Sequence, residues 1–294
     1  MADLRTRGGV IGFVGGLMPE LVGPAERSLR PSVRFEPIAP GSPAALWFGG
    51  GGPLPTGVAW PELERRPLHL ITTVDLSMVA DHDLSGSLPV DGMLLFFYDA
   101  VRQPWGFDPS HRDGWSVIYV AANEAANTEQ RFRVAHALDA EFMIPAVLAE
   151  RRFGAAYTQW TLPKSLLEDL DEDELDLDDD ELNHQLNHVD EALERNLFGD
   201  FPQMLGWPSA IQRPMERQCQ LVSNGIGNGG ADEDPRASEL EAGKRDWRLL
   251  LQVPSWDPIG GANWGDHGML YFWILEQDLA ACRFDRVWTI LQCM

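Results

Sequence analysis

Short apolar runs bounded by Gly and Pro recur along the chain, and they predict a β-rich protein. Residues Leu68–Val74 are rich in β-branched side chains and follow Pro67, which is typical of a strand. Residues Gly92–Tyr98 are almost continuously apolar, as in a strand that is buried on both faces. The same pattern predicts further strands at residues 115–120, 142–147 and 155–162.

Residues 182–197 have the clearest helical period. Their apolar side chains follow one another at offsets of 4, 3, 4 and 4, which places them on one face of a helix: Leu182, Leu186, Val189, Leu193 and Leu197. Aspartates before this segment suit the start of a helix, and Gly199 suits its end. By contrast, Pro and Gly are so dense between residues 31 and 61 that we expect an ordered loop laid over a sheet there.

Two pairs of strand-like segments repeat the same order of features. Pro67–Asp75 is followed by Asp91–Phe97, and Trp247–Ser255 is followed by His267–Trp273. Each pair reads strand, loop, Gly-Met-Leu and an aromatic-rich strand, with the Gly expected to supply a positive φ or a close backbone approach. This order predicts an internal duplication.

We therefore predict an α+β fold that is predominantly antiparallel β, with a roll-like, internally duplicated sheet unit and a few packed helices. One domain is expected over residues 31–294, after an N-terminal segment at 1–30. Its two pseudo-repeats span about 45–165 and 200–294, joined by an acidic helical linker at 165–199.

Acidic residues outnumber basic ones, and the formal net charge of −22 excludes nucleic acid and anionic membranes as expected partners. Residues 168–181 contain eleven acids and no base, but they contain no Gly, so a calcium-binding loop is not expected. No stretch approaches the roughly 20 apolar residues of a membrane span. The Gly-rich N-terminal run lacks a cleavage signature, so a signal peptide is not expected either.

The cysteines indicate a cytoplasmic protein, because three of them stand far apart and form no CxxC pair: Cys219, Cys282 and Cys293. Cys219 lies in the segment CQLV, which reads as a strand with a buried thiol. His184 and His188 have the i, i+4 spacing of metal ligands, but Gln185 stands where a metalloprotease needs Glu. We expect a solvated helix face there, no cofactor and no metal. The sequence favours a protein without enzymatic activity but leaves an enzyme open.

Four segments together resemble the YwqG-like proteins, a family of unknown function. They are residues 50–55 with Trp60-Pro61, residues 92–97, residues 205–212 continuing into 219–224, and residues 249–252 through 264–273 to 284–288 and 291–293. The resemblance covers about residue 30 to the C-terminus. It implies a β-rich, roll-like fold with packed helices and no particular reaction. The first half departs from the family, with Thr73 where a Gln is usual and residues 45–48 near an expected Ser.

Eleven Trp against four Tyr is an unusual ratio, and several Trp lie in Gly- and Pro-rich loops. Because Trp is a natural anchor at interfaces, we expect a non-catalytic module whose two halves form a groove for a peptide or protein partner. Given the charge, this partner should be basic or neutral. The candidate binding residues are Trp60, Trp207, Gln212, Gln252, Trp264 and Asp266.

Other interpretations stay open at this point. The segment Trp264–Gly268 suits a binding lip, but a turn in which Trp264 covers the core is favoured. Such a module would suit an accessory protein in peptide natural-product biosynthesis. The alternatives are a toxin-immunity protein, a metal-dependent hydrolase that uses His184 and His188 or the loop of His267, and a carbohydrate-binding module. An oligomer is also compatible with the sequence.

Overall fold

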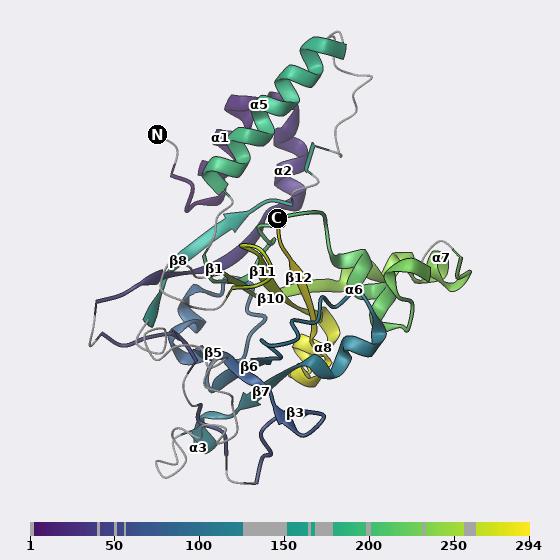
Figure 1. Cartoon of the computed structure of the whole chain (residues 1–294). Helices are drawn as coiled ribbons and strands as arrows, with labels where there is room; N and C mark the ends of the chain where they lie inside the picture. The colour runs from purple at the N-terminus through teal and green to yellow at the C-terminus, as the bar shows by residue number, and fades with distance from the viewer. Residues whose placement is uncertain are drawn as a thin grey trace.

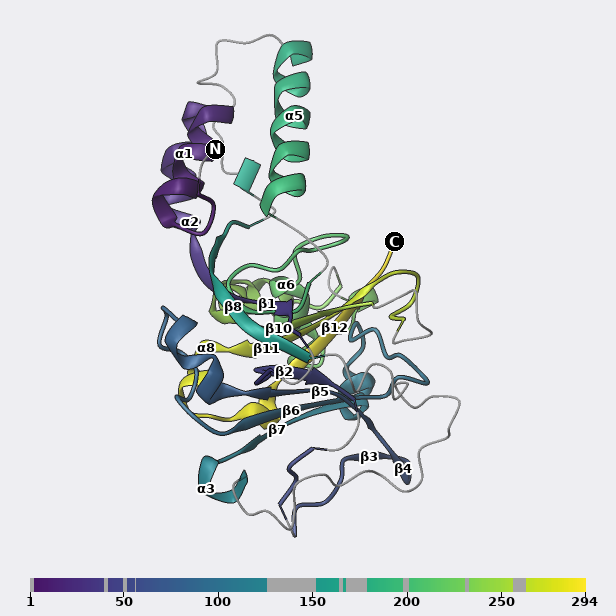
Figure 2. The same cartoon turned by 90° about the vertical axis from the view of Figure 1, so that its left-hand side faces the viewer.

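The fold was obtained as a computed structural model. It describes residues 3–39, 42–49, 52–55, 57–125, 152–163, 166–167, 179–197, 201–230, 233–255 and 263–294. The described part is α+β and is dominated by one antiparallel sheet that curls into a nearly closed barrel (Figures 1 and 2), as the apolar pattern predicts. The expected strand at residues 142–147 lies outside the described residues.

The large sheet has ten strands in the order β12-β11-β10-β9-β1-β8-β2-β5-β6-β7. The first half of the chain contributes β2 (Leu46–Phe48), β5 (His69–Asp75), β6 (Met93–Tyr98), β7 (Trp115–Val120) and β8 (Arg152–Thr161). The other strands are β1 (Arg30–Pro37), β9 (Gln203–Leu205), β10 (Trp247–Pro254), β11 (Met269–Leu275) and β12 (Trp288–Gln292). A separate hairpin joins β3 (Glu62–Leu63) to β4 (Arg66–Pro67).

The helices and short 3₁₀ turns lie before the first strand and between the later ones. The α-helices of the described residues are α1 (Arg7–Leu17), α2 (Val22–Ser28), α3 (Ala122–Ala125), α5 (Asp179–Leu197), α6 (Glu216–Ser223), α7 (Arg236–Leu240) and α8 (Glu276–Ala280). The 3₁₀ turns are η1 (Pro19–Leu21), η2 (Leu76–Met78), η3 (Ala80–His82), η4 (Pro109–Gly114), η8 (Asn228–Gly230), η9 (Glu241–Asp246) and η10 (Phe284–Arg286). None of the described helices is long and apolar enough to cross a membrane.

The two halves of the sheet match strand for strand in their pairing. Thr73 pairs with Leu95 in the β5–β6 hairpin, and Gln252 pairs with Tyr271 at the corresponding place in the β10–β11 hairpin. Each hairpin also has a register shift just before that pair, between Leu70 and Thr72 or between Leu249 and Leu251. The two hairpins therefore share one register, and the duplication itself stays a prediction from the sequence.

The two repeat glycines serve different backbone needs. Gly92 has a φ of +90° at the start of β6. Gly268 lies where a Cβ atom would come within 2.3 Å of the carbonyl oxygens of both Trp264 and Gln292. One glycine therefore permits a left-handed turn and the other permits a close approach of three backbone segments.

The loop that we expected between residues 31 and 61 is wrong at its start, because residues 30–37 form a central strand of the sheet. Residues 30–37 form β1, which pairs with β8 on one side and β9 on the other. Pro31 and Pro37 stand near the two ends of this strand, where a missing N–H is tolerated better than in the middle. Val33 and Phe35 between them are fully buried, so their burial stabilises a strand that the prolines conceal in the sequence.

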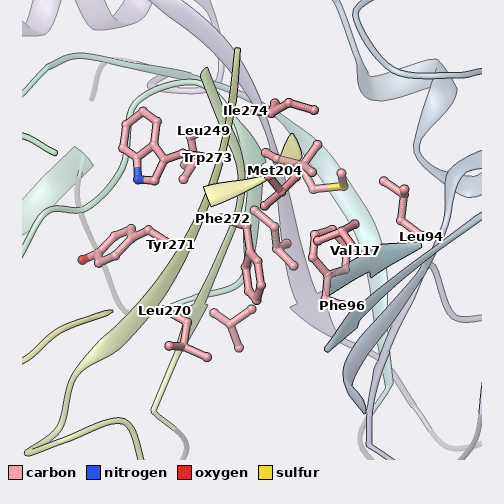
Figure 3. Close-up of a cluster of buried hydrophobic side chains, with 14 of the residues drawn as sticks. Leu94, Phe96, Val117, Met204, Leu249, Leu270, Tyr271, Phe272, Trp273 and Ile274 are labelled. Carbon is pink, nitrogen blue, oxygen red and sulfur yellow. The ribbon is translucent and has the colours of Figure 1, made fainter. Parts of the chain in front are cut away.

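Aromatic side chains of the two halves meet in the core. Phe96 and Phe272 each stand four positions after their repeat Gly, and their rings meet edge to face with centroids 5.0 Å apart. Figure 3 shows Phe272 projecting toward Phe96 and Val117, whereas Tyr271 and Trp273 point to the opposite side of β11. The curl of the sheet thus brings equivalent positions of the two hairpins into contact.

A helical lobe extends beyond the sheet in both views (Figures 1 and 2) and is formed by α1, α2 and α5. The predicted helix is confirmed, because Val189, Leu193 and Leu197 of α5 are buried against apolar side chains of α1 and α2. The N-terminal segment therefore does not stand alone but shares a core with the helix that joins the two halves.

We expect Phe272→Ala to lower the free energy of unfolding by about 3–5 kcal/mol, because it removes a fully buried ring and leaves a cavity opposite Phe96. Urea denaturation followed by circular dichroism measures this loss. Val90→Ala is the control, because Val90 is 74% exposed and its truncation should change stability by less than about 0.5 kcal/mol. Equal effects of the two substitutions would contradict a core built around Phe272.

Candidate functional site

Three adjacent strands carry polar side chains on the face of the sheet that points away from Phe96. Gln203 on β9 pairs with Gln252 on β10, which in turn pairs with Tyr271 on β11. The side-chain Oε1 of Gln252 accepts a hydrogen bond from the N–H of Ser209 at 2.9 Å, and the Tyr271 hydroxyl donates to the Ser209 carbonyl at 2.6 Å. The Nε2 of Gln203 donates to the carbonyls of Leu205 and Trp207, each at 2.9 Å.

A fourth polar side chain, Gln292 on β12, lies on the same face of the sheet, two positions after Ile290, which pairs with Tyr271. Its Oε1 accepts from the N–H of Gln212 at 3.1 Å, and its Nε2 donates to the carbonyl of Arg213 at 2.8 Å. The side chain of Gln212 donates to the carbonyl of Cys293 at 2.9 Å. Residues 205–215, which we call the Trp207 loop, are thus held on the sheet by hydrogen bonds from successive strands.

The start of the Trp207 loop requires a special backbone. Leu205 and Gly206 both have positive φ, at 60° and 70°, and a Cβ on Gly206 would lie 2.5 Å from Thr161 Oγ1. The same hydroxyl accepts a hydrogen bond from the Trp207 N–H at 2.8 Å. The Nε1–H of Trp207 donates to the Ser28 carbonyl at the end of α2, at 2.6 Å. Trp207 is therefore fixed from both its backbone and its ring.

A pocket of about 540 Å³ opens beside this indole. Its apolar walls are Trp207 and three prolines, namely Pro163, Pro208 and Pro214, together with Trp247 at the start of β10. Trp247 is buried, and its Nε1–H donates to Gln220 Oε1 on α6 at 2.9 Å. These walls have few rotatable bonds, so the pocket has its shape before any ligand arrives.

The charged side chains of the pocket are mostly basic. Arg30, Arg217, Lys244 and Arg245 line it with a single acid, Glu216. The guanidinium of Arg30 lies over the Trp207 ring with its central carbon 3.6 Å from the ring centroid. Burial, aided by the charge of Arg248, lowers the pKa of Arg30 to about 10, so this side chain stays cationic at neutral pH. Its NH1 atom is buried and has no hydrogen-bond partner among the described residues.

The other charges of the pocket are compensated or perturbed. Arg217 and Lys244 both contact the carboxylate of Glu241, at 2.9 and 2.6 Å. Burial raises the pKa of Glu216 at the first position of α6, although nearby backbone N–H groups and Arg30 oppose this shift. A carboxyl group and a guanidinium therefore share one partly dry site, where electrostatic interactions are stronger than in water.

The structure separates the residues that the sequence proposed for binding. Trp207 lines the pocket, whereas Gln212 and Gln252 form hydrogen bonds that hold the Trp207 loop on the sheet. Trp264 is buried and donates to the Pro254 carbonyl at 3.2 Å, as in the favoured interpretation of its segment, while Asp266 is exposed beside it. Their loop is tied to the first half, because the Gly265 N–H donates to Gln103 Oε1 at 2.8 Å.

Trp60 lies on the other half of the sheet. Its ring meets Phe97 edge to face at 5.1 Å, and its Nε1–H donates to the Leu68 carbonyl at 2.8 Å. It covers the apolar face of β5 and β6, far along the chain from the Trp207 loop. Trp256 lies outside the described residues.

Sequence reasoning missed Arg30 and Glu216 as members of the pocket. Arg30 precedes a proline and lies far from Trp207 in the chain, so only the pairing of β1 with β8 and β9 brings it there. The sequence of this acidic chain does not show that four bases lie at one site, because folding brings them together from distant segments.

The residues considered for catalysis lie elsewhere. Cys219 lies in α6 rather than in a strand, because CQLV supplies the buried face of a short helix. Its thiol is buried as expected, and burial raises its pKa well above the ordinary value, which disfavours the nucleophilic thiolate. His184 and His188 are exposed on α5, and within the described ranges no group of three His, Cys, Asp or Glu side chains gathers as a metal site.

Comparison with known proteins gives one match. The family model described as "Domain of unknown function (DUF1963)" matches residues 47–293. This range includes the Trp207 loop and both repeat hairpins, while α1, α2 and β1 precede it. No curated protein matches the chain.

We expect Glu216→Gln to stabilise the protein at about pH 7.5 and to have less effect at about pH 4. The folded state raises the pKa of Glu216, so the favourable contribution of its neutral carboxyl is present below the ordinary value of 4.5 and is lost as the pH rises through the folded pKa. Urea denaturation at both pH values measures the difference from wild type. Glu239→Gln, at an exposed position of α7, is the control; the same pH profile for both variants would disprove the buried site of Glu216.

Proposed function

The chain belongs to the DUF1963 family, and from this premise we propose that it is a non-catalytic binding module that takes a peptide segment of a partner into the Trp207 pocket. The observation that carries this proposal is the preformed pocket itself. Its volume lies in the range of about 300–1,000 Å³ that is typical of ligand sites. The hydrogen bonds of Gln203, Gln252 and Gln292 to the Trp207 loop hold it open without a ligand.

The composition of the walls favours a peptide. The half-buried Trp207 and the exposed Pro214 present apolar surface that suits an extended or proline-containing chain, as in grooves that bind polyproline segments. Trp and Arg, both present here, are the residue types that carry most binding energy at interfaces. The bases at the rim add charge that orients a polar backbone or side chain.

The lining favours binding over covalent catalysis. Among the described residues that line the pocket there is one carboxyl group, that of Glu216, and no Ser, Cys or His side chain. Acyl transfer by a protein nucleophile needs such a group next to a base. The pocket offers holding groups of fixed geometry instead.

The family group, the cellular location and the biological role that we propose are supported by the sequence. The resemblance of its four segments to YwqG-like proteins supports assigning this binding module to that group. The sparse, unpaired cysteines favour a cytoplasmic location. A role as an accessory protein in peptide natural-product biosynthesis suits a module that holds a peptide chain without cutting it.

A phage-displayed library of random peptides, selected on the immobilised full chain, tests this proposal. We expect the wild type to enrich a related set of peptides, and Trp207→Ala to weaken their binding by about 30-fold, as for a central interface Trp. Arg245→Glu, at an exposed place on the rim, should weaken the same peptides and covers the case that Trp207→Ala does not fold.

Trp105→Ala is the matched control, because Trp105 is 41% exposed and does not line the pocket. It should bind the selected peptides as wild type does. Enrichment no greater than on the bare support, or equal binding by the Trp207 variant, would refute a peptide site at this pocket.

A further inference from the structure

The charge of the Trp207 pocket opposes that of the whole chain. The chain has a formal net charge of −22, yet the pocket is lined by four bases and one acid. Glu241 neutralises part of this excess, because it pairs with Arg217 and Lys244. Arg30 forms no ion pair with the described residues, although the charges of Glu216 and Glu276 act on it, and it is the base of the pocket that lies over the Trp207 ring.

Arg30 is held in one place before a ligand binds. Its backbone carbonyl accepts a hydrogen bond from Thr161 Oγ1 at 3.1 Å, at the first pair of the β1–β8 ladder. Its guanidinium lies against the face of Trp207, whose own ring is fixed by Ser28. This contact with the indole ring holds the guanidinium in place, so little side-chain entropy is lost on binding.

Among the described residues that line the pocket, Arg30 is the one with a buried side-chain atom, NH1, that lacks a hydrogen-bond partner. A buried donor without an acceptor costs about 1–3 kcal/mol, so such atoms are rare unless something else satisfies them. A planar guanidinium matches the two oxygens of a carboxylate in a bidentate pair. A dianionic group would meet stronger repulsion from Glu216, which also lines the pocket.

We propose that the Trp207 pocket recognises a carboxylate of its peptide ligand, with Arg30 as the group that binds it. This inference rests on the proposed function and names the chemistry of its ligand. It replaces the expectation of a basic or neutral partner, because the charge at the site decides recognition at close range, whereas the net charge acts mainly on the approach. The apolar walls accommodate the side chain next to the carboxylate.

Nuclear magnetic resonance of the ¹⁵N-labelled full chain tests this proposal through the indole N–H signal of Trp207, which Trp207→Phe identifies. Three probes are titrated: N-acetylglycyl-phenylalanine with a free terminal carboxylate, its C-terminal amide, and N-acetylaspartyl-phenylalaninamide, whose carboxylate is on a side chain. We expect saturable shifts with a carboxylate probe and binding at least about tenfold weaker for the amide, since a charge-assisted pair is lost.

Variants of Arg30 separate the carboxylate contact from the rest of the pocket. Arg30→Met should reduce the affinity of the carboxylate probe to that of the amide, and Arg30→Lys should restore it in part, because Lys keeps the charge without the planar fork. Arg286→Met, an exposed Arg on η10, should leave all affinities unchanged. Whichever carboxylate probe binds more tightly assigns the group to a terminus or to a side chain.

The possible failures are distinct. Equal binding of acid and amide that survives Arg30→Met would overturn the carboxylate proposal while leaving a peptide site in place. Saturable shifts with inorganic phosphate but with none of the three peptides would overturn it in favour of a general oxyanion site. No shift with any probe, together with no enrichment from the peptide library, would overturn both the carboxylate and the proposed function.

Discussion

The pocket depends on hydrogen bonds between the sheet and the backbone of the Trp207 loop. Gln203, Gln252, Tyr271 and Gln292 rise from four successive strands and satisfy N–H and carbonyl groups that would otherwise be buried without partners. Each such bond contributes about 1 kcal/mol, but a buried group left unpaired costs more than that. The row therefore fixes one path for the loop and so fixes the wall that Trp207 forms.

The two halves share a strand frame but cover it differently. Where the second half has Gln252 and Tyr271, the first half has Thr73 and Leu95 at matching places in the register. The cover of the first half is correspondingly apolar, with Trp60 seated on Phe97. In the described residues, the strands of the first half are thus covered by an apolar contact, and those of the second half by a polar loop that forms the pocket.

Much of this frame can be predicted from the sequence, because strands β5, β6, β10 and β11 follow apolar runs, and helix α5 follows a strict period. Strand β1 could not be predicted, because the prolines at its ends hide the two buried apolar positions between them. Helix α6 could not be predicted either, because its eight residues are too few to show a helical period of apolar side chains. The pocket depends on contacts between distant segments: Arg30 meets Trp207 only through the seam of the sheet. Trp207 itself can be predicted as a binding residue, because it is one of the Trp residues that lie in Gly- and Pro-rich loops.

Hydrogen exchange at the Ser209 amide tests most directly whether the polar row holds the loop without a ligand. This N–H donates to Gln252 Oε1, so the ligand-free wild type should protect it from exchange, and Gln252→Leu should remove the protection while the amides of β11 keep theirs. A Ser209 amide that exchanges in the wild type as fast as an unstructured peptide would contradict a preformed pocket.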